Sequence, residues 1–565
     1  MRSAIALVGL LSTVLAVGAA EAPAKRAGFA WQAASLIAIQ DRGRFKPLET
    51  FAEESVLFVT GKRSWNKMCP IEVLFGWLVA FDREWEDHAF IRIDHTGLKQ
   101  AIGLDVSRKY FTPEEARNAP GLPALVRDAM AKEQRKERAS DIEKRALQLQ
   151  SQRGLLDAIA SGQALTILPN PSGGTEPWLA LAALAERSGV PYSAPQIESL
   201  AVAMRGVLDS FMAKDAGAWN DASLKLAGLL RDDLGRGVYP DASSLSREAH
   251  YNRLRPFRWA WVLYATAFVL FLVAIAGARV WARPAALASL GLGFGLHIYG
   301  FILRCLIAGR PPVTNMYESV IWVAWGCILF SLVIWAKYRS LAIPAAASVF
   351  ATVALVLADS LPLVLDPNIH PLEPVLRSNF WLTIHVLTIT LSYAAFALSL
   401  CLGNVVLGGF LLRPTDTDTI QTMSLYMYRA IQIGVVLLAA GTILGGVWAD
   451  YSWGRFWGWD PKEVWALIAL LLYLAVLHGR FAGWLKGFGF VTGTVMAFLG
   501  VLMAWYGVNF VLGVGLHSYG FGTGGMGWVL LYVGLQVGFI AAAGVRFRKA
   551  HQGKHLSTAI FPKGT

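Results

Sequence analysis

Cysteine and charged residues are both scarce in this 565-residue sequence. The four cysteines are too few and too scattered for a disulfide framework or a cysteine-based zinc site. No CxxC pair occurs, so the CxxCH motif is absent as well and the chain is not itself a c-type cytochrome. Charged residues make up 16% of the chain and hydrophobic residues 55%. This composition excludes a soluble cytosolic enzyme, a collagen-like chain and a disordered scaffold.

The scarcity of charge is confined to one half of the chain. About 8% of residues 257–545 are charged, against about 24% of the remainder. A formal net charge of +12 is compatible with nucleic-acid binding. However, the basic residues of the apolar half stand in pairs at the ends of apolar runs, where membrane topology requires them. We therefore expect a membrane protein with one solvated domain and no nucleic-acid partner.

Residues 1–22 have the pattern of a secretory signal peptide, with Arg2, a short apolar stretch and small residues at its end. The segment is either cleaved or retained as an anchor, and both outcomes place the domain after it outside the cytoplasm. Residues 28–255 have the composition of a mainly helical soluble domain, without a metal or nucleophile constellation. Cys69 in this domain is open to two interpretations, a packed small residue or a redox-active thiol.

Apolar segments of membrane-spanning length recur from residue 257 onward, which predicts an all-α polytopic helix bundle over 257–545 followed by a tail at 546–565. The expected spans are residues 257–279, 285–307, 318–336, 341–363, 380–411, 430–448, 463–483, 487–511 and 527–545. Basic pairs fall in alternate connections, which are therefore cytoplasmic. The connections at 309–319, 366–379, 448–463 and 514–527 then lie on the outer face, together with the soluble domain.

A loop rich in tryptophan, WADYSWGRFWGWDPKE, precedes the seventh span. An interfacial aromatic belt is one interpretation, because Trp and Tyr gather at headgroup depth. A belt requires neither fixed spacing nor glycine between the tryptophans. The cluster is better suited to stacking on a large, flat, apolar ligand. Arg455 in its centre is placed to pair with a carboxylate of that ligand.

This loop resembles the tryptophan-rich WWD signature of haem-handling membrane proteins, and the match continues through WGRFWGWDPKEVWALIALLLYLAVLHGR to His478. GRPPVTNMYESVIWVAWG, IHVLTITLSYA and GLHSYGFG are similar to the System II cytochrome c synthase of the CcsA (ResC) type. QDRGRFKPLETFAEESVLFVTGK is similar to the extracytoplasmic part of some longer members. The resemblance implies that Trp453, Trp457, Trp459, Asp460 and Arg455 contact haem.

Four histidines are candidate ligands of haem iron. His385 begins a span near the outer face and His517 lies in the last outer loop, so both flank the tryptophan loop. Two imidazoles are suitable axial ligands for haem, and the resemblance assigns this pair to an outer site. The resemblance gives His478, about 27 Å deeper by helical rise, a second site. Its partner histidine comes either from a CcsB (ResB) component or from His297, which the same arithmetic places at a compatible depth.

The resemblance implies a bacterial inner-membrane protein that moves haem b to the outer (periplasmic) face and attaches it to the CxxCH motif of apocytochrome c. As a cytochrome c haem lyase or synthase, it would act with a CcsB-like component and a thiol-reducing thioredoxin-like protein. Two alternatives stay open. One is a haem exporter that delivers haem to a chaperone, as in System I. The other is a non-haem membrane transporter, which would need acidic groups inside the spans, where Asp359 is nearly alone.

Overall fold

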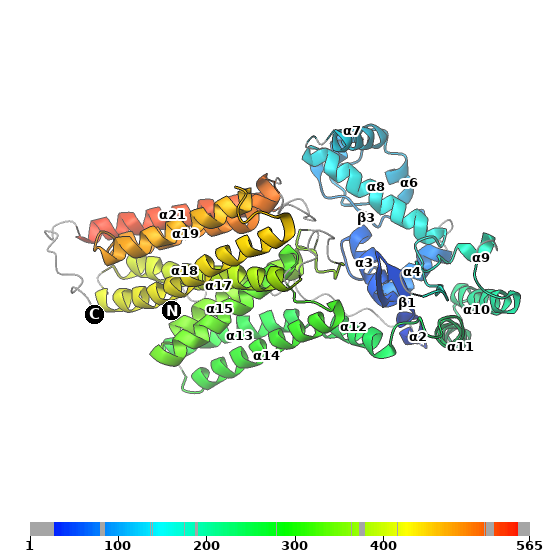
Figure 1. Ribbon diagram of the computed structural model, residues 1–565, viewed down its shortest axis with the longest axis horizontal. Coiled ribbons are helices and arrows are strands. Elements are labelled where there is room, and N and C mark those ends of the chain that lie inside the picture. The colour runs from blue at the N-terminus through cyan, green and yellow to red at the C-terminus, as the bar shows by residue number, and fades with distance from the viewer. Residues whose placement is uncertain are drawn as a thin grey trace. The chain divides into compact units, whose positions relative to one another are not determined.

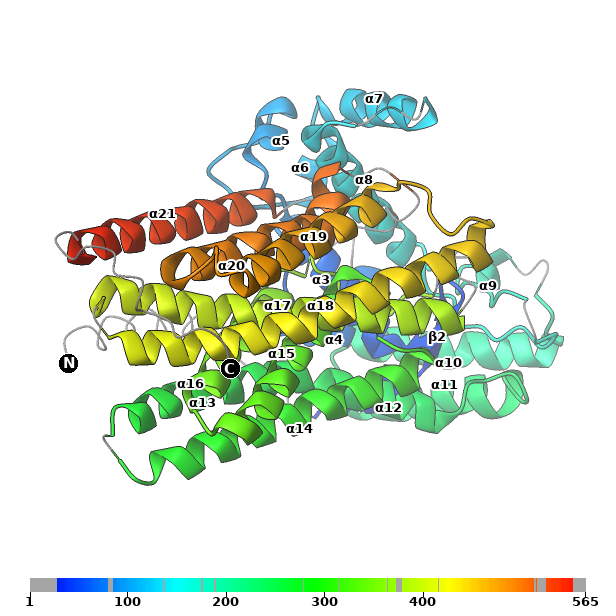
Figure 2. The ribbon, with the colours of Figure 1, turned by 60° about the vertical axis from the view of Figure 1, so that its left-hand side comes forward.

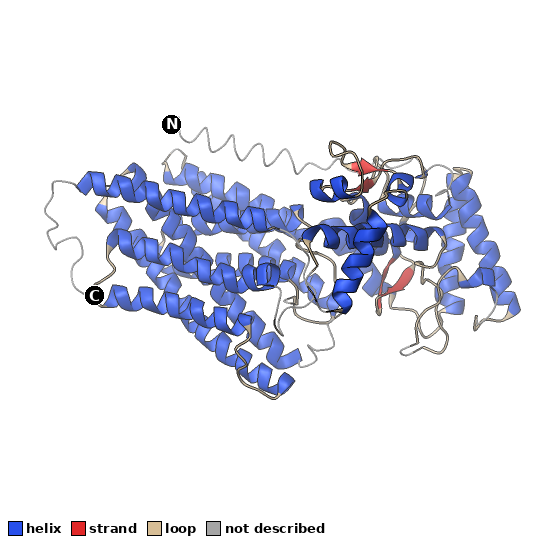
Figure 3. Cartoon of the chain, turned by 90° about the horizontal axis from the view of Figure 1, so that it is seen from above, coloured by secondary structure: helices blue, strands red, loops and turns tan. Residues whose placement is uncertain are grey.

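The computed structural model describes residues 28–79, 85–135, 137, 139–173, 176–186, 190–277, 279–312, 314–362, 364–371, 379–414, 416–512, 515 and 525–551. The expected signal segment and most of the expected tail lie outside the described residues. The chain divides into two compact units, residues 1–253 and 254–565. Helices dominate both units, and the strands form two small pairs in the first (Figure 3).

The first unit is mainly helical. Its elements are α2 (Gln32–Ser35), β1 (Ala38–Asp41), β2 (Arg44–Pro47), α3 (Leu48–Thr60), α4 (Pro70–Val79), β3 (Ile91–Arg92), α5 (Thr96–Ala101), β4 (Tyr110–Phe111), α6 (Pro113–Arg117), α7 (Leu122–Gln134), α8 (Asp141–Ala160), α9 (Ala183–Glu186), α10 (Ala194–Met212), α11 (Ala216–Gly228), the π-helix η2 (Leu229–Leu234) and α12 (Ala242–Leu254). The strand pairs β1–β2 and β3–β4 are both antiparallel. Helix α8 begins with a capping box between Ser140 and Glu143, which satisfies two backbone donors at its start.

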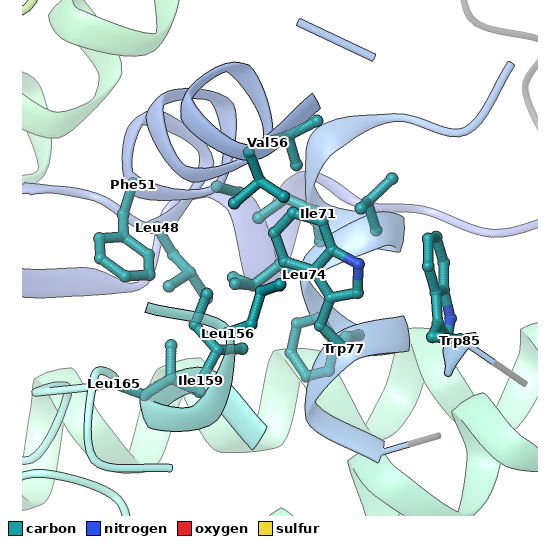
Figure 4. Close-up of a cluster of buried hydrophobic side chains, with 14 of the residues drawn as sticks. Leu48, Phe51, Val56, Ile71, Leu74, Trp77, Trp85, Leu156, Ile159 and Leu165 are labelled. Atoms are coloured by element: carbon teal, nitrogen blue, oxygen red, sulfur yellow. The ribbon is translucent and has the colours of Figure 1, made fainter. Parts of the chain in front are cut away.

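The core of this unit lies where α3, α4 and α8 meet. Figure 4 shows Leu48 and Val56 of α3, Ile71 and Trp77 of α4 and Leu156 of α8 around one apolar centre, and each is at most 2% exposed. Burying a side chain of this size contributes about 1.5–3 kcal/mol. The first unit therefore has the core of a solvated domain.

The second unit is a bundle of long helices. They are α13 (Pro256–Ile275), α14 (Ala282–Ala308), α15 (Met316–Tyr338), α16 (Ala342–Ser360), α17 (Asn379–Leu412), α18 (Thr417–Trp453), α19 (Pro461–Phe481), α20 (Gly487–Leu502), its π-helical continuation η4 (Met503–Leu512) and α21 (Met526–His551). Among the described residues, nine helices are long and apolar enough to cross a membrane. The prediction of an all-α polytopic membrane bundle is confirmed.

Helix α17 is the centre of the bundle. It packs against α15, α16, α18, α20 and α21, and runs beside α18 along most of its length (Figure 1). Its apolar span is 61% buried, whereas that of α21 is only 11% buried. Figure 2 shows α14 and α21 at opposite edges of the bundle, with α17 and α18 between them. A residue on α17 is thus held by several neighbours, whereas much of α21 remains uncovered.

Candidate functional site

A large cavity opens where α15 and α19 begin. Its walls come from the first turns of α15, the first half of α17, the end of α18, the segment between α18 and α19, the start of α19, and η4. The cavity holds about 1100 Å³ of empty space, a volume that includes its opening. Most of its lining is apolar or aromatic, with a few polar side chains among them. This combination is typical of a site for a large apolar ligand.

His385, in the second turn of α17, lines this cavity. Its Nδ1 lies 2.7 Å from the carbonyl oxygen of Gly441 on α18. A carbonyl only accepts, so Nδ1 carries the proton and Nε2 carries the ring's lone pair. A hydrogen bond of this kind is the usual way in which a protein orients an imidazole for a metal. The ring also lies parallel to the indole of Trp448, at 7° and 6.3 Å between centroids.

Glycines on α18 make room for this arrangement. A Cβ atom added at Gly445 would lie 2.6 Å from Cε1 of His385, closer than such atoms approach. One added at Gly441 would lie 2.8 Å from the Cα of Ile389, and one at Gly446 would lie 2.5 Å from the Phe456 ring. The imidazole reaches its position only because this face of α18 lacks side chains.

The tryptophans of the loop divide between two places. Trp457 lines the cavity, together with Trp448 and Phe456. Trp453 packs edge-on against Trp448, with ring centroids 4.7 Å apart, and does not line the cavity. Trp459 is 71% exposed, and its φ of +57° is unusual for a residue other than glycine. The loop therefore contributes one of these three tryptophans to the cavity.

Arg455 does not reach the cavity. Its guanidinium carbon lies 5.8 Å from the centre of the Trp453 ring. It also packs on Gly458, where an added Cβ atom would overlap the guanidinium. The arginine therefore packs against residues of its own loop and stabilises the loop.

Asp460 starts helix α19 as part of a capping box. The N–H of Lys462 donates to the Asp460 carboxylate at 3.0 Å, and the Glu463 carboxylate accepts from the N–H groups of Asp460 and Gly458. These bonds satisfy donors that a helix start otherwise leaves open. Asp460 is 6% exposed and does not line the cavity. Gly515 lies against it, since an added Cβ atom would be 2.4 Å from Oδ2 of Asp460. His517 lies outside the described residues.

His478 lies near the other end of α19 and is exposed. Eighteen residues separate it from Asp460, which corresponds to about 27 Å along a helix. Its Nδ1 donates to the carbonyl of Leu474 at 2.7 Å, which leaves the lone pair on Nε2 as in His385. His478 therefore has the ring form of an iron ligand, on a surface rather than in a cavity.

The structure does not bring His297 to His478. His297 on α14 is fully buried, and its Nδ1 lies 3.2 Å from the hydroxyl of Tyr264. Phe301 stacks on its ring and Phe257 meets it edge-on. His478 is exposed on a different helix. The compatible depths expected from the sequence therefore do not make the two rings neighbours.

The sequence reasoning missed a buried carboxylate. Glu318, in the first turn of α15, is fully buried and pairs with Arg304 of α14, also fully buried, at 2.8 Å. Arg310 also contacts Glu318, and Arg304 donates to the carbonyl of Pro367 at 2.8 Å. The expectation that Asp359 is nearly alone was wrong, although the sequence motif NMYES contains this glutamate. The charge of Glu318 is therefore matched by Arg304 and Arg310 inside the bundle.

Lys462, Asn509 and Trp505 were also not expected at the site, yet all three line the cavity. Nζ of Lys462 donates to the Asn509 side chain at 2.9 Å. The Asn509 amide in turn donates to the backbone carbonyl of Trp505 at 3.0 Å. Asn509 and Trp505 both belong to the π-helical stretch η4, and short π-helical stretches are frequent at functional sites.

Cys69 in the first unit precedes α4. Burial raises the pKa of its thiol to about 11, and the nearby carboxylates of Glu72 and Glu49 act in the same direction. A thiol with so high a pKa is almost fully protonated at neutral pH, so it is a poor nucleophile. Of the two interpretations, the packed residue fits this environment better.

Comparisons with known proteins agree with the sequence resemblance. Residues 313–517 match the family model of the cytochrome c assembly protein. NrfI of Wolinella succinogenes is 30% identical over 519 residues, which cover 86% of this chain and 54% of NrfI. The chain thus spans about half the length of that relative.

Shorter relatives are covered more fully. CcsA of Synechococcus sp. strain CC9902 is 34% identical over 302 residues, which are 47% of this chain and 98% of that protein. CcsA of Prochlorococcus marinus strain MIT 9215 is 37% identical over 252 residues, 39% of this chain and 79% of the relative. The chain therefore covers nearly the whole of one CcsA protein, and it belongs to the CcsA family of cytochrome c biogenesis proteins.

Proposed function

We propose that this protein binds haem b in the cavity, presents it at the outer face of the bacterial inner membrane and attaches it to the CxxCH motif of apocytochrome c. The single observation that carries the proposal is the placement of His385. Its imidazole lines a large apolar cavity with the lone pair on Nε2, and a backbone carbonyl fixes its orientation. Membership of the CcsA family supports the same proposal.

The residues around His385 suit haem as a substrate. Trp448, Trp457, Phe456 and Trp505 offer aromatic surface to a flat macrocycle. The cavity is open on one side and mostly apolar, which suits a flat macrocycle whose polar edge stays near solvent. Neutral imidazole is a common axial ligand of haem iron. His517 remains our prediction for the second axial ligand, and the histidine of an incoming CxxCH motif would replace one of the two.

Attachment consists of two additions, one at each vinyl group. In each addition the S–H bond of a cysteine and the π bond of the vinyl C=C break, the sulfur bonds to one vinyl carbon and the hydrogen bonds to the other. No external electrons are needed. The protein contributes by holding one haem orientation against the peptide, because fixed proximity removes much of the entropic barrier. Since only reduced thiols add, a thioredoxin-like protein that reduces the CxxCH cysteines is part of the proposal.

His478 belongs to a second, loading site in this proposal. An exposed imidazole with its lone pair on Nε2 is suited to a ligand site completed by another chain. A CcsB-like membrane component would supply the opposing histidine. His297 is not assigned to this site, because aromatic rings enclose it inside the bundle. The same end of the bundle carries Lys337, Arg339 and Arg480, so we assign that end to the cytoplasm.

The test is reconstitution with the purified full-length chain and its CcsB-like partner. The complex is loaded with ferrous haem and mixed with a reduced CxxCH peptide, and thioether formation is followed by the shift of the α-band. We expect the His385→Ala variant to lose attachment and added imidazole to restore part of it. Haem binding without thioether formation in the wild type would support a haem exporter instead. Absence of bound haem would support a non-haem transporter.

A further inference from the structure

We propose that Lys462 recognises a carboxylate of the flat ligand and thereby sets which edge of that ligand points toward the start of α19. This inference rests on the proposed function and deepens it. Lys462 is the second residue of α19, and its side chain lines the cavity that also contains His385. It is the one lysine or arginine among the described residues that line this cavity.

The position of Lys462 is electrostatically unusual. The first turn of a helix carries a partial positive charge, so a cation there is disfavoured and acidic residues are preferred. The neighbouring residues follow that preference, since Asp460 and Glu463 cap the helix. A lysine that faces a mostly apolar cavity from this turn also loses hydration. The nearby carboxylate of Asp460 offsets part of this cost, and an anionic group of the ligand would offset more of it.

Asp460 lies close enough to attract the Lys462 ammonium, whereas Glu463 and Arg455 have other contacts. The carboxylate of Glu463 accepts hydrogen bonds from the N–H groups of Gly458 and Asp460, at 2.8 and 3.1 Å. Arg455, the basic residue that the sequence favoured for this task, lies over Trp453 and outside the lining. Asn509 holds the lysine nitrogen from η4 at 2.9 Å, so the ammonium is positioned before the ligand arrives.

The consequence is an orientation of haem. The two propionates of haem b lie at one edge of the macrocycle and the two vinyl groups lie toward the other. If Lys462 binds a propionate, the vinyl groups point away from the first turn of α19. The reacting edge is then left for the peptide. Lys462 is a positioning residue in this scheme, because it touches a carboxylate that does not react.

The test compares two probes, ferric haem and its dimethyl ester, which lacks the free carboxylates. All variants are made in the full-length chain with His478→Ala, so that binding reports on the cavity. Each probe is titrated into the protein in detergent, and binding is followed by the Soret band. We expect Lys462→Met to weaken haem binding about tenfold or more while binding of the ester stays unchanged. Lys462→Arg should retain the preference for haem. The matched control is Arg455→Met, for which the ratio of the two affinities should equal that of the parent chain.

The outcomes separate this inference from the proposed function. Equal weakening of both probes by Lys462→Met, or no weakening of either, overturns the inference, since a bracing role through Asn509 affects both probes alike. If the ratio of the two affinities changes in Arg455→Met but not in Lys462→Met, the inference is also overturned, and Arg455 is the residue that recognises the carboxylate. If His385→Ala leaves the binding of both probes unchanged, the proposed haem site itself fails.

Discussion

The two ends of helix α19 differ in how completely this chain builds them. At its first turn, residues of this chain alone line a cavity, among them rings from α17 and α18. A capping box fixes the start of the helix there, and Lys462 donates to Asn509. At its last turns, His478 is exposed and its polar contact is with a carbonyl of its own helix. Under the proposed function, the difference means that this chain would hold haem in its own cavity at one end of α19 and would supply only one ligand at the other. The cavity end should depend on residues of this chain alone, and the His478 end on a partner.

The largest effect is expected at the unfinished end. In a complex with the CcsB-like partner, His478→Ala should lower the haem bound at the loading site between tenfold and a hundredfold, because loss even of outer-shell partners costs about that much. His297→Ala should change haem content little. Haem per folded protein is measured by the pyridine haemochrome assay. Equal losses in both variants, with no further loss in the double variant, would restore His297 as the shared ligand.

A smaller effect is expected from the glycine face of α18. Gly445→Ala places a methyl group against the His385 ring, so the ring must move. A displacement of about 1 Å can cost up to about a hundredfold in the rate of a positioned reaction, so thioether attachment should fall about tenfold or more. Soret titration and thioether yield check this. Gly408→Ala is the matched control, since an added Cβ atom there has no neighbour within 4 Å. Unchanged haem binding in Gly445→Ala would show that His385 is not held as the structure describes.

The tryptophan loop should show a division between its two parts. Trp457→Ala removes a ring from the cavity and should weaken haem binding by about 1 kcal/mol, or about fivefold. Trp459→Ala removes a mostly exposed ring and should leave the affinity nearly unchanged. Comparable losses in the two variants would mean that the loop closes over haem as one platform, as the sequence suggested.

The smallest effect is expected in the first unit, which belongs to neither end of α19. At pH 7 Cys69 should react with iodoacetamide far more slowly than an unperturbed thiol, and the rate should rise as pH approaches about 11, where the thiolate forms. Cys69→Ser should leave cytochrome c yield unchanged. A fast reaction at neutral pH, measured by mass spectrometry, would return Cys69 to the redox-active interpretation.

For the part of the chain that the structure describes, the sequence predicted the number and order of the spans, because the length of an apolar span follows from membrane thickness. It placed α18 at 430–448, whereas the helix runs from Thr417 to Trp453. Hydropathy does not detect the polar ends of a helix that continues beyond the apolar core. The capped start of α19 was visible as a motif, but its lysine was not recognised as part of the site.

The sequence could not predict which side chains of different helices lie next to one another. Helical rise gave His297 and His478 compatible depths, yet depth does not say which helices are neighbours. That information comes from packing, which sets His297 among the rings of α13 and α14. The role of the α18 glycines could not be predicted either, because it depends on the side chains that they lack, which leaves room for the His385 ring.

The exposed imidazole of His478 has a consequence for assembly. If the proposed CcsB-like partner covers His478, the chain without that partner would be less stable in the membrane, because lipid offers a ring nitrogen no hydrogen bonds. A membrane protease that extracts poorly inserted helices would then remove orphan chains first. Such selective turnover would keep the two subunits in equal number without any control of their synthesis.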